Sequence, residues 1–273
     1  MKSNRDLTNR LAFDNVAEQY ESSRPQYPRE LFSDLARFGN LGRDSTILEV
    51  GAGTGQASED LCERFGTVTA IEPGPSLLKI LKSKTRRHKN IDCKNILFED
   101  FKVTEKFHCL FSANAFHWID PAVAYSKAHA ALVQGGVLAL SWNFPRISEH
   151  AQRAVDELTI KFDSEHRFSV TPRSDEEYLK EIEAVMEQGA RELLDSGFFE
   201  EPKEIRYPLS RTLTVSQYQD LVKSYANVAS FEEGKKEEFG YALEELLKDR
   251  FSDGVDVSDF AILRLSHSLI VNG

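Results

Sequence analysis

Apolar residues recur in two alternating patterns along the first half of the chain. Short apolar runs at 46–50, 68–71 and 107–112 are bounded by glycine or by polar residues. Runs of this length predict strands that are buried on both faces of a parallel sheet. Between them, leucine and phenylalanine recur at helical spacing, as at 30–38 and 56–65. The alternation of strand and helix predicts a doubly wound α/β sheet with right-handed crossovers.

Turn and cap signals place the next elements of this sheet. A helix should follow the second strand, with Ser76 as its N-cap. A less apolar third strand is expected at 90–97, and its composition suggests a position near an edge of the sheet. A helix at 125–133, ended by the glycine-containing segment 134–136, should lead into a fifth strand at 137–142.

The pattern changes after the fifth strand. Helices are expected near 150–162 and 176–196, separated by a polar stretch, and this connection is longer than one crossover needs. Alternating apolar residues at 203–209 predict a sixth strand. A helical insertion at 214–249 then precedes the last strand, which is expected at 260–271.

The first strand ends in a turn with glycine at alternate positions, Gly51, Gly53 and Gly55. Glycine lets the backbone take positive φ and lets a ligand approach the main chain, beside free N–H groups at the start of the next helix. The dinucleotide-binding fingerprint needs its third glycine at the sixth position, where this chain has Gln56. Glu49, two residues before the turn, would repel a pyrophosphate and attract an ammonium group. The pattern therefore favours a nucleoside that carries an amino acid over one that carries phosphates.

An acid, Glu72, directly follows the second strand. An acid about twenty residues after the glycine turn suits the two ribose hydroxyls of a bound nucleoside. The carboxyl end of a strand in an open parallel sheet also faces the ligand crevice. We therefore expect Glu72 to bind a ribose, the alternative being a solvated acid in a loop.

The composition of the chain limits the classes of partner that it is expected to bind. Over 273 residues, 34 Lys and Arg against 44 Asp and Glu give a formal net charge of −10, which argues against nucleic acid and favours a small-molecule partner. The basic residues at 79–89 read as a solvated helix end. Cys62, Cys93 and Cys109 lack metal-ligand spacing, so we expect reduced core thiols and no metal. With no signal-peptide core and no apolar run of about 18 residues, the protein is expected to be soluble, cytoplasmic and without membrane contact.

The residues Glu-Val-Gly-Ala-Gly-Thr-Gly at 49–55 resemble the glycine turn of class I S-adenosylmethionine-dependent methyltransferases. The resemblance implies S-adenosyl-L-methionine as cofactor, with the turn under its methionyl chain and ribose. Glu49 would lie near the methionine amino end and Glu72 at the ribose. The resemblance also implies an antiparallel last strand inserted beside the fifth. The expected fold is therefore Rossmann-like, a seven-stranded, mostly parallel sheet with helical lid insertions.

Two further segments resemble a subset of this family, the enzymes similar to trans-aconitate and ubiquinone-biosynthesis methyltransferases. One is residues 116–118, in a loop where the substrate should meet the sulfonium side of the cofactor. The other begins within an expected helix at 7–20 and continues through the loop after it, and in that subset it folds over the cofactor pocket. Its matching residues are Val16, Tyr20, Arg24, Pro25, Tyr27 and Pro28.

We expect one domain, residues 1–273, built from three parts. Residues 1–45 would cover the cofactor pocket, and residues 46–142 would form the cofactor-binding core. The insertions at 145–196 and 214–249 would form a lid over the substrate mouth.

The turn at 98–101 should hold the adenine in the resembling family. The commoner family pattern has a Gly-Asp pair just before this turn, whereas this chain has Ile96 and Leu97. Three possibilities follow: Glu99 or Asp100 accepts a hydrogen bond from the adenine amine, or the base stacks on Phe98.

The expected cofactor-binding residues lie at the carboxyl ends of strands or in the N-terminal segment. They are Tyr20, Arg24, Glu49, Gly51, Ala52, Gly53, Thr54, Gly55, Gln56, Glu72, Pro73, Phe98, Glu99, Asp100, Asn114, Ala115, Phe116 and Trp118. His117 is a candidate general base, because a neutral imidazole could take a proton from the acceptor. Methyl transfer from a sulfonium needs mainly alignment and desolvation, which favours a histidine that fixes the loop instead.

The leading hypothesis is an enzyme that transfers a methyl group from S-adenosylmethionine to an oxygen, nitrogen or carbon of a small molecule. One alternative is a non-catalytic module that binds the same cofactor. Another is an NAD-dependent oxidoreductase, which Gln56 and Glu49 disfavour.

Overall fold

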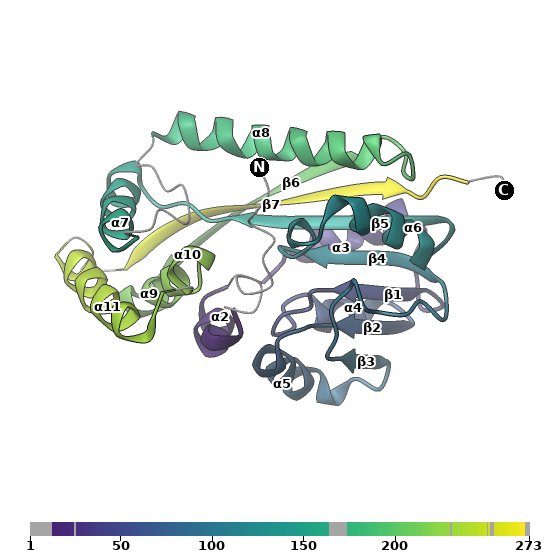
Figure 1. Ribbon diagram of the computed structural model, residues 1–273, viewed down its shortest axis with the longest axis horizontal. Coiled ribbons are helices and arrows are strands. Elements are labelled where there is room, and N and C mark those ends of the chain that lie inside the picture. The colour runs from purple at the N-terminus through teal and green to yellow at the C-terminus, as the bar shows by residue number, and fades with distance from the viewer. Residues whose placement is uncertain are drawn as a thin grey trace.

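A seven-stranded sheet runs through the part of the chain that the computed structural model describes, residues 13–24, 26–163, 174–229, 231–249, 251 and 254–270. The strands are β1 (Thr46–Val50), β2 (Thr67–Ile71), β3 (Ile91–Lys94), β4 (Phe107–Ala113), β5 (Leu132–Phe144), β6 (Lys203–Leu213) and β7 (Val255–His267). Their order is β3-β2-β1-β4-β5-β7-β6 (Figure 1).

The direction of the strands confirms the expected topology. β3, β2, β1, β4 and β5 pair in parallel, whereas β7 is antiparallel to both β5 and β6. The last strand of the chain is thus inserted beside the fifth, and the less apolar β3 lies at the edge of the sheet. The fold is a Rossmann-like, mostly parallel doubly wound sheet.

Helices connect the strands in the expected alternation. The α-helices are α2 (Ala17–Ser23), α3 (Arg29–Phe38), α4 (Ser58–Arg64), α5 (Pro75–Lys84), α6 (Pro121–Ala131), α7 (Glu149–Phe162), α8 (Asp175–Asp195), α9 (Val215–Lys223), α10 (Ala226–Ala229) and α11 (Glu233–Lys248). The 3-10 helices are η1 (Phe13–Val16), η2 (Thr85–Arg87) and η3 (Phe116–Trp118). Of the N-terminal helix expected at 7–20, residues 7–12 lie outside the described residues, and the rest forms η1 and α2.

Helices cover both faces of the sheet. Ile47 and Leu48 are neighbours on β1, and because side chains alternate along a strand they point to opposite faces. Ile47 packs in one core with α3 and α4, through residues such as Leu35. Leu48 packs in the other core with α6 and α8, through Ala128 and Leu193. The carboxyl ends of the parallel strands remain open between these two layers.

A third hydrophobic core lies at the far ends of β6 and β7, which extend beyond the rest of the sheet (Figure 1). There Leu213 and Val255 pack with Val155 of α7, Leu221 of α9 and Leu243 of α11. We call α7, α9, α10 and α11 the lid. It reaches the N-terminal segment, because α2 contacts α9.

The two helices of the insertion at 145–196 pack in different places. α8 lies along the sheet (Figure 1). Its Ile182 and Met186 are buried against Ile262 of β7. α7 packs instead with α9 and α11 in the third hydrophobic core. An amphipathic helix can bury its apolar face on either surface.

The N-terminus of α5 corrects one expectation. Its N-cap is Gly74, with Pro75 in the first turn, and Ser76 is not the cap. Asp14 of η1 supplies the missing acceptor instead. Its Oδ1 accepts from the backbone N–H of Ser76 at 2.6 Å and of Leu77 at 3.1 Å. A residue distant in sequence therefore caps this helix.

Several element ends also differ from the predicted ones. α6 begins at Pro121 behind the N-cap Asp120 and ends at Ala131, so the glycines at 134–136 belong to β5 and do not end the helix. β3 is shorter than expected and β6 longer, since β6 continues along β7 as far as Leu213. β7 begins and ends earlier than predicted. Among the described residues, none of the helices has the length and apolar character needed to span a membrane.

Candidate functional site

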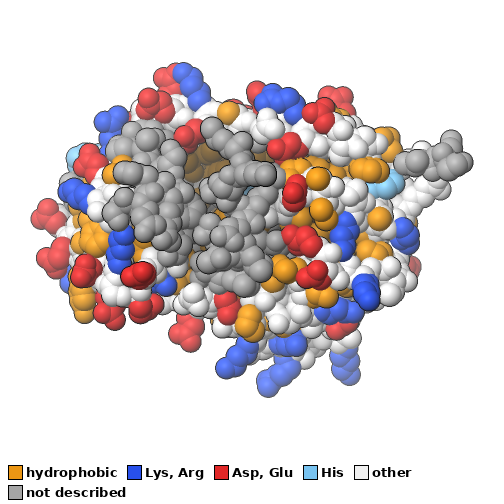
Figure 2. Space-filling model, in the orientation of Figure 1, with side chains coloured by type: hydrophobic (Ala, Val, Ile, Leu, Met, Phe, Trp, Pro, Cys, Tyr) orange, Lys and Arg blue, Asp and Glu red, His pale blue; other side chains and the backbone are white. Residues whose placement is uncertain are grey.

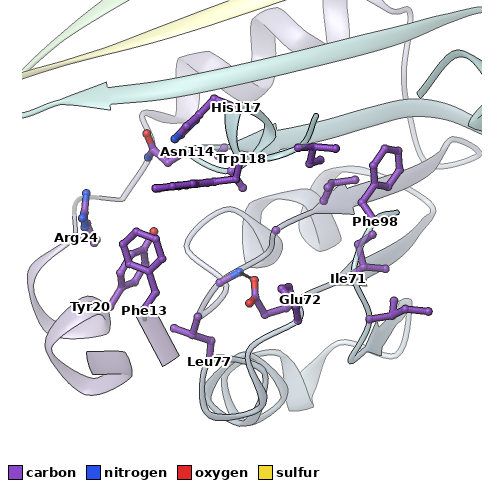
Figure 3. A pocket seen from close by; sticks show the side chains of 18 of the residues that line it. Phe13, Tyr20, Arg24, Ile71, Glu72, Leu77, Phe98, Asn114, His117 and Trp118 are labelled. Carbon is purple, nitrogen blue, oxygen red and sulfur yellow. Dashed lines mark hydrogen bonds between the residues drawn. The ribbon is translucent and has the colours of Figure 1, made fainter. Parts of the chain in front are cut away.

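The carboxyl ends of β1, β2 and β4 surround a cavity of about 270 Å³, which we call the glycine-turn cavity (Figure 3). It is lined by Phe13, Tyr20, Arg24, Val50, Gly51, Gly53, Ile71, Glu72, Pro73, Leu77, Ile96, Phe98, Ala113, Asn114, Ala115, His117, Trp118, Ile119 and Tyr225. Ligands of open α/β sheets bind outside the carboxyl ends of the strands, which is the position of this cavity.

A second, smaller cavity adjoins the first, and we call it the inner cavity. Both cavities share Tyr20, Arg24 and Asn114 in their walls. The inner cavity is also lined by Glu49 and Tyr27. The two cavities therefore form one elongated site, with Glu72 in the larger part and Glu49 in the smaller part.

The backbone of the glycine turn shapes the floor of this site. Gly51 has φ of 70°, and a Cβ atom built there would lie 2.3 Å from the Cβ of Ala115. Gly53 has φ of 59°, and a Cβ atom built there would make ordinary van der Waals contact with Tyr20 Cε1 and Gln56 Oε1, both at 3.7 Å, without a clash. Gly51 is thus required by close packing against the loop after β4. Gly53 leaves room beside the main chain for a ligand.

Glu72 holds the glycine turn against the start of α5. Its side chain is buried, and its two carboxylate oxygens accept from the N–H of Gly53 at 2.9 Å and the N–H of Gly74 at 2.8 Å. A carboxylate oxygen can accept more than one hydrogen bond. Glu72 is therefore oriented by the backbone while it lines the larger cavity, where it can also accept from hydroxyl groups.

Glu49 is the buried acid of the inner cavity. Ser58 Oγ donates a hydrogen bond of 2.6 Å to Glu49 Oε2. Burial raises the pKa of Glu49 to about 8; the hydrogen bond from Ser58 lowers it, and the charge of Glu72 raises it further. A carboxylate in this position gains from a cation beside it, because an opposite charge favours its ionised form.

Arg24 brings a cation to the same inner cavity. Its guanidinium lies 4.9 Å from the ring centroid of Tyr20 and 5.4 Å from that of Tyr225. Arg24 Nε donates to Ser224 Oγ at 3.1 Å, and Nη2 donates to the carbonyl oxygen of Ser224 at 3.0 Å. These hydrogen bonds fix Arg24 against the lid. The wall of the inner cavity therefore contains one carboxyl group, of Glu49, and one cation, of Arg24.

Asn114 lies at the junction of the site with φ of 52°, a left-handed conformation that is uncommon outside glycine. Its Nδ2 donates to the hydroxyl of Tyr27 at 2.9 Å, and its Oδ1 accepts from the N–H of Asn143 at 3.0 Å. Burial raises the pKa of Tyr27 well above its usual range. Asn114 therefore ties the end of β4 to β5 and to the N-terminal segment.

The turn at 98–101 places Phe98 in the site and its two acids outside. Phe98 is buried and lines the glycine-turn cavity together with Ile96. Glu99 and Asp100 lie outside both cavities, and the carbonyl oxygen of Glu99 accepts from Lys127 Nζ. This geometry favours stacking on Phe98 among the three possibilities.

Most of the expected site residues meet at the two cavities. In their walls are Tyr20, Arg24, Glu49, Gly51, Ala52, Gly53, Gln56, Glu72, Pro73, Phe98, Asn114, Ala115, His117 and Trp118. His117 is exposed and lies at the rim beside Trp118, with ring centroids 5.2 Å apart.

Five expected residues lie outside the two cavities: Thr54, Gly55, Phe116, Glu99 and Asp100. Thr54 is fully buried and accepts from Gln56 Nε2, and Gly55 packs under Leu81. Phe116 is buried in the core on the α6 side of the sheet. Within the glycine turn, Gly51, Ala52, Gly53 and Gln56 thus line the cavities, whereas Thr54 and Gly55 pack against the protein.

Sequence reasoning missed several wall residues. They are Phe13, Val50, Ala57, Ile71, Leu77, Ile96, Ala113, Ile119, Asn143 and Tyr225. Val50, Ile71 and Ala113 are the last residues of their strands, so the rule that ligands bind at strand ends could have found them. Phe13 and Tyr225 come from distant segments, and no local pattern marks them.

Comparisons with known proteins agree with this geometry. Residues 48–140 match a protein family described as "Methyltransferase domain". An uncharacterized methyltransferase of Mycobacterium tuberculosis is 32% identical over 143 residues, 52% of this chain and 55% of that protein. The chain therefore spans about half the length of that relative.

Two further similarities extend over nearly the whole chain. An uncharacterized methyltransferase of Schizosaccharomyces pombe is 24% identical over 256 residues, 91% of this chain and 92% of that protein. A proposed type II methyltransferase from Anaeromyxobacter dehalogenans is 19% identical and superposes with a TM-score of 0.62, covering 91% of this chain and 99% of that one. This structural likeness shows a common fold.

Proposed function

We propose that this chain, which carries a class I S-adenosylmethionine-dependent methyltransferase domain, transfers a methyl group from that cofactor to a small-molecule acceptor. The chain's strong negative charge supports a small molecule rather than nucleic acid as the acceptor. The atom that receives the methyl group, oxygen, nitrogen or carbon, is left open by this proposal.

The single observation that carries the proposal is the distribution of charge along the elongated site. The inner cavity presents the carboxyl group of Glu49, which suits the ammonium of an amino acid, and the guanidinium of Arg24, which suits its carboxylate. The larger cavity presents Glu72, which suits the hydroxyls of a ribose. An amino acid joined to a nucleoside matches both ends, and S-adenosylmethionine is such a molecule.

The residues of the chain would divide the work of binding as follows. Glu49 and Arg24 hold the methionine end, Gly53 allows the backbone to approach, and Glu72 holds the ribose. Phe98 offers an aromatic face to the adenine. When bound, the cofactor supplies a methyl group to the lone pair of the acceptor, and the electron pair of the broken carbon–sulfur bond stays on sulfur.

The site contributes to such a reaction mainly by alignment and by exclusion of water. Tyr20, Arg24 and Tyr225 come from α2 and the lid and form part of the wall of the glycine-turn cavity. They cover the side that would otherwise face solvent. His117 lies at the rim and is exposed, so we assign it a place beside the acceptor and no essential proton transfer.

We also propose that the chain belongs to the subset similar to trans-aconitate and ubiquinone-biosynthesis methyltransferases. The matching N-terminal residues Tyr20, Arg24 and Tyr27 all line the candidate site, which supports this assignment. We likewise propose that the chain is a single domain with the three parts described above. We also propose a cytoplasmic location, as expected from the sequence.

Two measurements test the proposed function. Titration calorimetry should show binding of S-adenosylmethionine and no binding of NAD. Incubation of the full chain with S-adenosylmethionine and a panel of small acceptors should yield S-adenosylhomocysteine in proportion to methylated product. Binding without turnover over a broad panel would instead support the non-catalytic module.

A further inference from the structure

A third cavity, of about 600 Å³, lies between α8 and the sheet, and we call it the α8 cavity. It borders the glycine-turn cavity, because both are lined by Asn114, His117 and Ile119. These residues come from the loop after β4, which lies beside the candidate cofactor site. A volume of this size falls in the range of small-molecule binding sites, about 300–1,000 Å³.

The wall of the α8 cavity is mainly apolar. Trp142 and Phe144 line it from β5, Tyr125 from α6, and Met186 from α8. Val185 of α8 also lines it and is 60% exposed. In Figure 2 hydrophobic side chains gather beneath α8, toward the upper right of the view. Such a surface favours the body of an apolar molecule.

The charged residues of this cavity do not favour an anion. Arg264 is the one basic residue in its described wall, and its side chain is 1% exposed. Its charge is already balanced, because Nε and Nη2 donate to Glu204 Oε1 at 2.8 and 2.6 Å, and the guanidinium lies 5.2 Å from the ring centroid of Trp142. The remaining charged wall residues are acids of α8, Glu181 and Glu192.

We propose that the α8 cavity holds the methyl acceptor, a molecule with an apolar body and no negative charge, either neutral or cationic. Its nucleophilic end would pass between Asn114 and His117 toward the glycine-turn cavity, while its body packs against Trp142 and Phe144. This inference rests on the proposed function, since it needs the cofactor in the neighbouring cavity. It adds the place and the chemical class of the acceptor.

Binding of N-phenyl-1-naphthylamine, a neutral apolar dye that fluoresces in apolar sites, tests the proposal without turnover. The full chain should bind it saturably, and Ala184→Phe should weaken binding at least tenfold. Ala184 lines the cavity but is exposed on α8, so a larger side chain there fills the cavity without displacing a packed residue. Glu187→Phe on the same helix is the matched control, because Glu187 is exposed and lies outside the cavity wall.

The location of the dye can be read from tryptophan. The chain has two tryptophans, so Trp118→Phe leaves Trp142 alone in the wall of the α8 cavity. Energy transfer from Trp142 to the dye should persist in this variant and should fall in the variant that also carries Ala184→Phe. Transfer that is insensitive to Ala184→Phe would place the dye elsewhere and overturn the proposal.

Displacement of the dye tests the charge of the acceptor. Octanol and octylamine should displace it, whereas octanoate should need at least tenfold higher concentration. Equal displacement by octanoate would contradict the assigned class. Calorimetry with S-adenosylmethionine distinguishes failure of the proposed function from failure of the proposed acceptor site. If the unmodified chain does not bind S-adenosylmethionine, the proposed function is refuted. If it binds S-adenosylmethionine but not the dye, only the α8 cavity is refuted as the acceptor site.

Discussion

At the scale of single residues, Glu49 combines burial with a ligand-binding position. Its pKa is raised to about 8, mainly by burial, whereas the ordinary value is 4.5. Between these values the folded chain holds a proton that the unfolded chain has released. Folding stability should therefore fall as pH rises from about 4.5 to about 8, and stay level above that.

Glu49→Gln should remove this dependence, because an amide of similar shape does not titrate in that range. Urea unfolding at pH 5.5 and 8.5 measures it. The difference in unfolding free energy between the two pH values should be smaller in the variant than in the unmodified chain. Equal differences in both chains would show that Glu49 is ionised in the folded state throughout this range.

Glu72 can be tested through the part of the ligand that it is proposed to hold. Glu72→Ala should weaken the binding of S-adenosylmethionine by about 1.5–3 kcal/mol, the usual contribution of hydrogen bonds to a charged group. Glu72 also accepts from the N–H groups of Gly53 and Gly74, so its loss also loosens the turn. An analogue without both ribose hydroxyls isolates the direct contact. Calorimetry should show a clearly smaller loss for this analogue, and an equal loss would remove Glu72 as the ribose partner.

The sequence placed both acids near the ends of strands, because the strands were visible as apolar runs. Glu49 is the second-last residue of β1, and Glu72 directly follows β2. Thr54 and Phe116 lie outside the glycine-turn cavity and the inner cavity, because the direction of a side chain in a turn depends on neighbours from other segments. Phe116 turns toward Tyr125 of α6, with ring centroids 5.5 Å apart, and that partner lies outside the loop.

At the scale of elements, the start of α5 shows how a distant residue completes a helix. Asp14→Ala should lower the free energy of unfolding by about 0.5–2 kcal/mol, the usual cost of losing an N-terminal cap. Asp14→Asn keeps an acceptor oxygen and should cost less. Urea unfolding of both variants measures the difference. Equal stability of Asp14→Ala and the unmodified chain would show that these hydrogen bonds are replaced by water.

The elements of the core were predicted better than those outside it. β1 was predicted with the observed ends, since glycine and polar residues bound its apolar run. The glycines at 134–136 were read as a helix end, yet they lie in β5, where the pairing with β4 shifts its register between Phe107 and Cys109. The extensions of β6 and β7 come from their mutual pairing, which no single segment encodes.

At the scale of the whole molecule, the site is built between a sheet and two coverings. The sheet supplies Glu49, Glu72 and Asn114, while α2 and the lid supply Tyr20, Arg24 and Tyr225. The hydrogen bonds from Arg24 to Ser224 join the two coverings over the site. Sequence periodicity predicted helices in the lid, but whether a helix packs on the sheet or on the lid is decided by long-range contacts, as α8 shows.

Binding of S-adenosylmethionine to Gly53→Val, measured by titration calorimetry, tests whether the glycine-turn cavity holds this cofactor. Gly53 has φ of 59° and lines both cavities, so a branched side chain there would occupy volume that the ligand needs. Gly135→Val is the matched control, because Gly135 has φ of 71°, lies away from the site and has no atom of the described residues within 4 Å of an added Cβ, so this variant carries a similar backbone strain. Thermal unfolding checks that both variants fold.

We expect the unmodified chain and Gly135→Val to bind S-adenosylmethionine, whereas folded Gly53→Val should not bind it. Unchanged affinity in folded Gly53→Val, or no binding by the unmodified chain, would contradict the assignment of the glycine-turn cavity to this cofactor.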